Sequence, residues 1–100
     1  MRFGLTPEQL SFISTKIVQP IRSSGADVYV YGSRARGDHK PFSDLDLMIE
    51  GPSHDQLIHP LQEKLQTSNF PYKVDLVRFE EYAESYKPSY LKDRIRWPEL

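Results

Sequence analysis

Two acidic residues separated by one position, in the segment Asp44-Leu45-Asp46, are the side chains of this sequence best suited to chemistry. In a β-strand, side chains two positions apart share a face, so these carboxylates would stand about 7 Å apart. Carboxylates that close repel each other, and a divalent cation such as Mg²⁺, which prefers oxygen ligands, relieves the repulsion. Taken alone, such a pair is more typical of a solvated strand face or of capping residues.

A third acid, Asp75, belongs to a second alternating segment, residues 73–79, where Val74 and Leu76 have the opposite parity. An acid that arrives from another strand would allow two ions to be held, one for nucleotide phosphates and one for an attacking oxygen. This arrangement favours phosphoryl or nucleotidyl transfer. The placement of Asp75 depends on register, because a slip of one residue would turn it to the other face of the sheet.

A glycine-serine pair, Gly32-Ser33, directly follows the β-branched and aromatic run Val28 to Tyr31, which predicts a strand that ends in a tight turn. Glycine permits close backbone approach, and the exposed amides and the serine hydroxyl could hold terminal phosphates. Taken alone, a Gly-Ser pair is usually an ordinary turn. Three cations that follow the turn could bind a triphosphate or simply face water: Arg34, Arg36 and Lys40.

These features form a joint pattern: Gly32-Ser33, ten residues, then Asp44-x-Asp46, and later Asp75 in an alternating segment. The pattern resembles the signature of the DNA polymerase β-like nucleotidyltransferase superfamily. Within it, residues 32–37 (GSRARG) and 43–47 (SDLDL) are similar to the minimal nucleotidyltransferases, the MNT-type antitoxins that are paired with HEPN-domain toxins. The resemblance covers nearly the whole chain.

The resemblance implies a role for each matching residue. Gly32 and Ser33 would hold the nucleotide phosphates, with Arg34 and Arg36 as further nucleotide-binding candidates. The metal ligands and catalytic acids would be Asp44, Asp46 and Asp75. Asp75 would either complete a second ion site or accept the proton of the acceptor hydroxyl.

The same resemblance implies an activity, cofactor and partner. The expected reaction is Mg²⁺-dependent transfer of AMP from ATP to a hydroxyl group, that of a tyrosine in a partner HEPN toxin. The chain would restrain this toxin as its antitoxin and would form a hetero-oligomer with it. One alternative is a binding module that masks the toxin without catalysis. Another is an enzyme for a small molecule such as an aminoglycoside, although those relatives carry an additional domain that this short sequence leaves little room for.

Capping signals place two helices. Thr6-Pro7-Glu8-Gln9 reads as an N-cap, a first-turn proline and a capping-box glutamine, and the helix should end before Gly25, with a kink or an early end at Pro20. After the break at Gly51-Pro52, a second capping box from Ser53 to Gln56 is expected to begin another helix.

The predicted strands are residues 28–31, 44–50 and 73–79, each next to a helix or a turn. This order indicates an α/β (α+β) fold: a small mixed β-sheet with helices packed on one face, similar to the nucleotidyltransferase fold. The aliphatic parity of each strand would meet the helices. The three carboxylates would then project from the opposite face.

Composition limits the remaining functions. The 100 residues carry 38% hydrophobic and 27% charged side chains, so we expect residues 1–100 to form one globular domain. The formal net charge of −1 excludes a general basic field for nucleic acid. The absence of cysteine excludes disulfides and thiolate chemistry. No apolar run approaches about 18 residues, and no signal-peptide core follows Met1, so a cytoplasmic protein without membrane contact is expected.

Histidine and tyrosine give weaker signals. The histidines, His39, His54 and His59, show no metal-ligand spacing and are expected to face solvent. The tyrosines recur every four residues, at Tyr82, Tyr86 and Tyr90, and are expected to pack within the protein. The segment 86–97 mixes aromatic and basic residues, a composition that also suits a protein interface.

Overall fold

The computed structural model describes residues 2–99. Its helices are α1 (Pro7–Ile13), α2 (Gln19–Ser23), α3 (Ser33–Arg36), α4 (Asp55–Thr67) and α5 (Lys87–Asp93). Its strands are β1 (Asp27–Tyr31), β2 (Leu45–Glu50), β3 (Val74–Arg78) and β4 (Ile95–Arg96). A π-helical turn, η2 (Ser14–Val18), joins α1 to α2, and short 3₁₀ turns lie at η1 (Arg2–Gly4), η3 (Phe79–Glu81) and η4 (Glu84–Tyr86).

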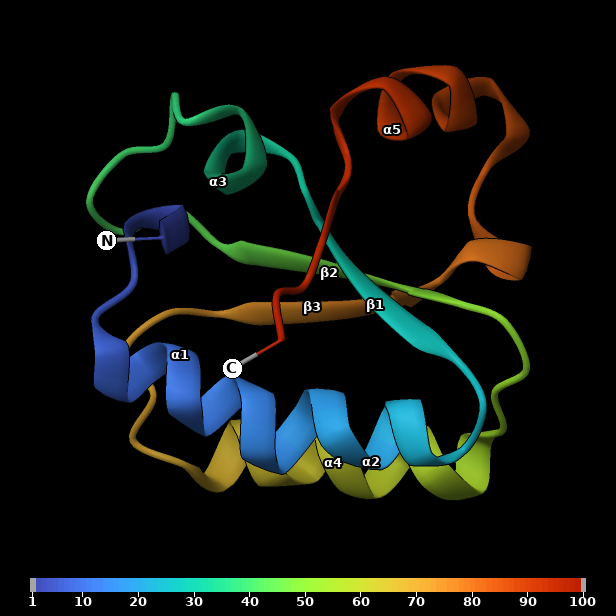
Figure 1. The fold of residues 1–100 in the computed structure, drawn as a ribbon, viewed down its shortest axis with the longest axis horizontal. Helices are drawn as coiled ribbons and strands as arrows, with labels where there is room; N and C mark the ends of the chain where they lie inside the picture. The colour runs from blue at the N-terminus through green and yellow to red at the C-terminus, as the bar shows by residue number, and fades with distance from the viewer. Residues whose placement is uncertain (1, 100) are drawn as a thin grey trace.

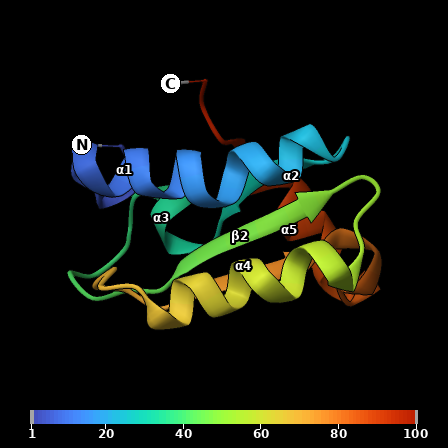
Figure 2. The same ribbon diagram turned by 90° about the horizontal axis from the view of Figure 1, so that it is seen from below.

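The four strands form one mixed sheet in the order β3-β2-β1-β4 (Figure 1). β1 is antiparallel to β2 and β4, whereas β2 and β3 are parallel. Parallel neighbours need a crossover, and α4 supplies it between β2 and β3. The α1–η2–α2 helix and α4 cover the same face of the sheet (Figures 1 and 2). The predicted mixed sheet is confirmed, and these two helices pack on one face as expected, whereas α5 lies on the other face.

The first helix begins and ends where the sequence predicts. Thr6 and Gln9 form the reciprocal capping box, with Gln9 N–H donating to Thr6 Oγ1 at 3.1 Å. Near Pro20 the helix departs from α geometry: the π-helical turn Ser14–Val18 lies just ahead of the proline, which lacks a donor N–H and whose ring crowds the carbonyl four residues earlier. The helix ends at Ser23, before Gly25.

The predicted start of α4 is wrong. The helix begins at Asp55 with His54 as its N-cap, and no side chain caps it. Ser53 is instead buried, and its Oγ has no hydrogen-bond partner among the described residues. Asp55 supplies a negative charge to the first turn, which the helix dipole favours.

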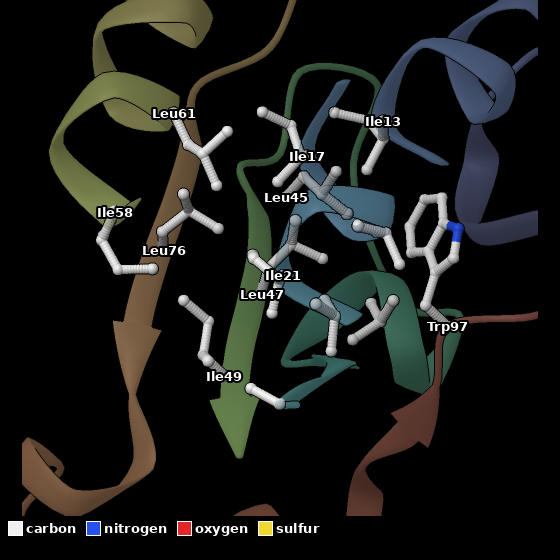
Figure 3. Close-up of a cluster of buried hydrophobic side chains, with 14 of the residues drawn as sticks. Ile13, Ile17, Ile21, Leu45, Leu47, Ile49, Ile58, Leu61, Leu76 and Trp97 are labelled. Carbon is white, nitrogen blue, oxygen red and sulfur yellow. The ribbon is translucent and has the colours of Figure 1, made fainter. Parts of the chain in front are cut away.

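The core lies between the sheet and these helices (Figure 3). Each fully buried aliphatic side chain contributes about 1.5–3 kcal/mol. Those that Figure 3 labels in this layer are Ile13, Ile17, Ile21, Leu45, Leu47, Ile49, Ile58, Leu61 and Leu76. No helix within residues 2–99 has both the length and the apolar character needed to cross a membrane.

The C-terminal segment adds two features that the sequence did not reveal. β4 pairs with β1, and Trp97 beside it is fully buried and donates its indole N–H to Ser14 Oγ at 2.7 Å. The interface interpretation therefore does not hold for Trp97. α5 lies on the face opposite the other long helices, where Tyr90 is 3% exposed and its ring centroid lies 5.3 Å from that of Tyr31 (Figure 1).

Candidate active site

Strand register brings two of the predicted acids together. Asp46 of β2 lies opposite Asp75 of β3, and on its other side it lies opposite Tyr31 of β1. Tyr31, Asp46 and Asp75 therefore form a row across the sheet, on the face away from the core. Asp44 stands just before β2, with the same parity, and is exposed. The register confirms the predicted face for Asp46 and Asp75, whereas the placement of Asp44, which lies before the strand, stays a prediction.

The burial and the negative charges of this row favour the binding of a proton or a cation. Burial, followed by the negative charges of Asp75 and Asp44, raises the pKa of Asp46 to about 6. The Lys73 ammonium lies 3.5 Å from Asp75 Oδ1 and partly offsets this repulsion. A buried carboxylate that its neighbours repel gains stability from any positive charge placed between them.

The donor set suits a hard divalent cation such as Mg²⁺, since all three side chains offer carboxylate oxygens. Within residues 2–99, no three His, Cys, Asp or Glu side chains are gathered tightly enough to enclose an ion as they stand. Asp46 and Asp75 are the adjacent pair, and exposed Asp44 stands at the open end of the strand. The fit therefore rests on ligand chemistry and on the raised pKa of Asp46.

Gly32 is required by the close approach of its loop to this row. Its φ of 73° lies in the left-handed region, and a Cβ at this position would stand 2.6 Å from Asp46 Oδ2. Gly32 caps α3, so Ser33 is the first residue of that short helix. The structure thus places the predicted phosphate loop directly against one of the predicted metal ligands.

Arg34 has a different role from the predicted one. It is 2% exposed, its Nε and Nη2 donate to Ser43 C=O at 3.0 and 2.9 Å, and its Nη1 donates to Phe3 C=O at 2.8 Å. The guanidinium also lies 4.2 Å from the ring centroid of Tyr72. Because its donors are used on backbone carbonyls, Arg34 is not available to a nucleotide. Arg34 instead fixes the residue that precedes Asp44.

Ser43 closes the turn that delivers the acidic strand. Its Oγ accepts the Lys40 N–H at 2.8 Å, and its own N–H donates to Lys40 C=O at 3.1 Å. Together with the Arg34 contacts, these bonds hold the start of β2 against α3. Ser43 thus orients the acidic strand.

A cavity of about 210 Å³ opens beside Gly32, between α3 and α5. Its remaining lining residues are Tyr31, Arg36, Tyr82, Tyr86, Ser89, Tyr90 and Asp93. Arg36 is exposed, and its Nε lies 3.2 Å from Asp38 Oδ2. Arg36 therefore remains the one predicted arginine that the structure leaves at the edge of the loop.

The tyrosines of this cavity are packed to different degrees. The ring centroid of Tyr31 lies 5.9 Å from that of Tyr82, and Tyr82 lies 5.8 Å from Tyr86. Tyr90 is packed as predicted, whereas Tyr86 is 61% exposed. Burial and the nearby Asp46 charge raise the pKa of Tyr31 above its ordinary value, so its hydroxyl stays protonated at neutral pH.

Other residues of this face were missed from the sequence. Glu50, at the end of β2, accepts hydrogen bonds from the Tyr90 hydroxyl and from Arg94, and these bonds tie α5 to the sheet. The alternation of β2 placed Glu50 on this face, but nothing local revealed its partners 40 and 44 residues away. Solvent exposure is confirmed for His54 and His59 but is wrong for His39, whose Nδ1 is buried without a partner among the described residues.

Comparison with known proteins decides the family. The model of the nucleotidyltransferase domain family matches residues 14–98. The chain belongs to this family. It is a nucleotidyltransferase, as the Gly-Ser and Asp-x-Asp pattern led us to expect.

Two similar proteins refine the comparison. Over 88 residues, the chain is 32% identical to the probable protein adenylyltransferase MntA of Haemophilus influenzae, covering 86% of this nucleotidyltransferase and 75% of that protein. The fold is similar to that of a chain in a crystal structure of a toxin–antitoxin with AMP-PNP, with a TM-score of 0.63, 19% identity, and coverage of 85% of this chain and 72% of that one. At this identity, the second likeness shows the fold alone.

Proposed function

We propose that this nucleotidyltransferase transfers AMP from ATP, with Mg²⁺, to a tyrosine hydroxyl of a partner HEPN-domain toxin and so acts as its antitoxin. The observation that carries the proposal is the pairing of Asp46 with Asp75 directly against Gly32. The relative MntA, a probable protein adenylyltransferase, supports an adenylyl group as cargo and a protein as acceptor. The similar fold in a toxin–antitoxin crystallised with AMP-PNP supports a toxin partner and an ATP-like nucleotide.

The nucleotide would bind where the Gly32 loop meets the tyrosine-lined cavity. The backbone at Gly32 and the hydroxyl of Ser33 hold phosphate oxygens, because glycine lets the chain approach them closely. Arg36, exposed at the cavity edge, offsets the charge of the departing pyrophosphate. Arg34 takes no part in this binding and acts by holding the Ser43 carbonyl.

The carboxylates Asp44, Asp46 and Asp75 would hold Mg²⁺. When bound, the ion neutralises phosphate charge and lowers the cost of forming the attacking oxygen. Asp75 lies at the outer end of the carboxylate row, where it takes the proton of the acceptor hydroxyl. The acceptor oxygen forms a bond to the α-phosphorus, the bond from that phosphorus to the bridging oxygen breaks, and pyrophosphate leaves. Positioning supplies most of the acceleration.

The decisive experiment follows the label of α-labelled ATP in the presence of Mg²⁺ and the partner toxin. The unmodified chain is expected to label the toxin, and Asp46→Asn is expected to lose the label. Glu63→Gln, an exposed acid on α4, is the control and is expected to retain it. Equal toxin binding by all three proteins without label would show that the chain masks its partner by binding alone.

A second measurement tests the metal independently of the partner. Added Mg²⁺ is expected to raise the thermal unfolding temperature of the unmodified chain, because the ion binds the folded carboxylates and not the unfolded chain. Asp46→Asn is expected to show a smaller shift. Equal shifts in the two proteins would contradict a metal site at Asp46.

A further inference from the structure

The outer edge of β3 carries an unused row of backbone hydrogen-bonding groups. β3 has β2 as its single neighbour in the sheet, and Leu45 N–H donates to Lys73 C=O at 2.8 Å. In a parallel pair, the backbone groups of successive residues point alternately toward the partner strand and away from it. Because Lys73 points toward β2, the backbone N–H and C=O groups of Val74, Leu76 and Arg78 point away from the sheet. Within residues 2–99, no backbone hydrogen bond outside the sheet uses them. Such an edge is a template for another strand.

A groove runs along this edge. Two cavities, of about 510 and 310 Å³, share Gln62, Leu76 and Val77 and together extend along the whole of β3. The facing wall is one stripe of α4, three to four residues apart: Asp55, Ile58, His59, Gln62, Leu65 and Gln66. Ile58 and Leu76 line the groove as apolar side chains, and Figure 3 shows Leu76 of β3 lying toward Ile58 and Leu61 of α4.

The groove opens onto the carboxylate row. Asp75 and Tyr31 line its larger cavity, together with Lys73. Tyr31 also lines the cavity beside Gly32, which does not include Asp75. Tyr31 therefore separates two cavities, one beside the Gly32 loop and one beside Asp75. A molecule in the groove therefore reaches Asp75 from a space that Gly32 does not line.

We propose that this groove binds an extended segment of the acceptor protein as an added β-strand, which carries the acceptor hydroxyl to Asp75. The inference rests on the proposed function and names the form in which the substrate is presented. An alternating row of free N–H and C=O groups is satisfied by another extended backbone, whereas a helix has already used its own. No proline interrupts Val74–Arg78, so the edge lacks one of the guards against strand addition.

A reversible block tests the groove. The sequence contains no cysteine, so Gln66→Cys places a single thiol on the α4 wall, and Gln56→Cys places one on the same helix outside the lining residues. Each variant is modified with a bulky methanethiosulfonate reagent and desalted. Toxin labelling by α-labelled ATP is expected to fall at least about tenfold for modified Gln66→Cys and to return after reduction. Modified Gln56→Cys is expected to be unaffected.

The outcomes separate this inference from the proposed function. Absence of toxin labelling by the unmodified chain would overturn the proposed function and this inference with it. Normal labelling that survives the block at Gln66→Cys would overturn the groove alone. Loss of labelling at both cysteine positions would also contradict the groove, because Gln56 does not line it.

A backbone variant tests strand addition itself. Val74→Pro removes one outward N–H and leaves the bonds to β2 in place, and proline is tolerated at the first residue of a strand. Val74→Ala removes most of the same side chain but keeps the N–H. Toxin labelling by Val74→Pro is expected to be about tenfold lower than by Val74→Ala, with both shown to be folded by thermal unfolding. Equal labelling would contradict an added strand.

Discussion

The two faces of β2 differ in the charge that they carry. Toward the helices, Leu45, Leu47 and Ile49 are at most 1% exposed and pack against aliphatic side chains. Toward the other face lie Asp46 and Glu50, with the fully buried Met48 between them, and burial and neighbouring charge raise the pKa of Asp46 to about 6. One six-residue strand thus serves stability on one face and chemistry on the other. Substitutions on the two faces should therefore separate activity from stability.

Asp46→Asn should give the largest effect and should move activity and stability in opposite directions. AMP transfer to the toxin is expected to fall at least about 10³-fold, roughly 4 kcal/mol, because a proposed metal ligand is lost. The free energy of unfolding at neutral pH is expected to rise by about 1 kcal/mol, after allowance for solvent screening, because a repelled charge is removed. Toxin labelling and urea denaturation without divalent cations measure the two changes.

The pH dependence of that stability gain follows from the pKa of Asp46. Folding raises it from 3.8 to about 6, so the stability that its proton contributes is complete below 3.8 and is lost as pH rises through about 6. The gap between Asp46→Asn and the unmodified chain should therefore be large at pH about 7.5 and small at pH about 4.5. A gap of equal size at both values would contradict the raised pKa.

Leu47→Ala should show the opposite behaviour on the helix face. Leu47 is fully buried, so the cavity left behind is expected to cost about 3 kcal/mol of unfolding free energy and to lower the melting temperature by on the order of 15 °C. Well below the transition, toxin labelling should be retained. If folded Leu47→Ala lost labelling as completely as Asp46→Asn, the assignment of stability to one face of β2 and activity to the other would be wrong.

Gly32→Ala should have an intermediate effect, about 2 kcal/mol, felt in both activity and stability. The added Cβ meets Asp46 Oδ2 at 2.6 Å, and alanine would have to keep a left-handed φ of 73°, which L-residues rarely adopt. The matched control is Gly25→Ala, which has a φ of 100° but no heavy atom within 4 Å of the added Cβ. Labelling is expected to fall about 30-fold for Gly32→Ala alone. Equal losses in both variants would show that backbone strain, and not the contact with Asp46, is responsible.

Glu50→Gln should produce the smallest change. Glu50 is a carboxylate on the same face as Asp46, but its partners are Tyr90 and Arg94. Losing its charge should cost about 1 kcal/mol of unfolding free energy, measured by urea denaturation, and should change toxin labelling less than about threefold. A loss of labelling comparable to that of Asp46→Asn would extend the chemical site to the far end of β2.

Local patterns predicted the parts of the fold that short segments determine. The capping box at Thr6, the end of the helix before Gly25 and the parity of Asp46 and Asp75 all depend on neighbouring residues. The burial of Arg34 could not be predicted from the sequence. One of its acceptors, Phe3, is distant in sequence, and the other, Ser43, is brought close by a turn.

The C-terminal segment was equally hidden from the sequence. The burial of Trp97 depends on Ser14, 83 residues away, and the position of α5 depends on Glu50. A single sequence contains no signal for pairs so far apart. The sequence placed Asp46 and Asp75 on one face, but the distances among the three carboxylates depend on how the strands and the loop before β2 pack, and within residues 2–99 no three acids enclose an ion.

The parallel pairing of β2 and β3 sets the order in which the machinery can be assembled. The antiparallel partner of Asp46, Tyr31, is nearby in the chain, whereas Asp75 arrives only after α4 has formed and crossed over. Contacts between distant segments form late, since a long loop must close first. A nascent or partly unfolded chain should therefore form its glycine loop before it can transfer a nucleotidyl group. Transfer activity would then require the complete sheet topology.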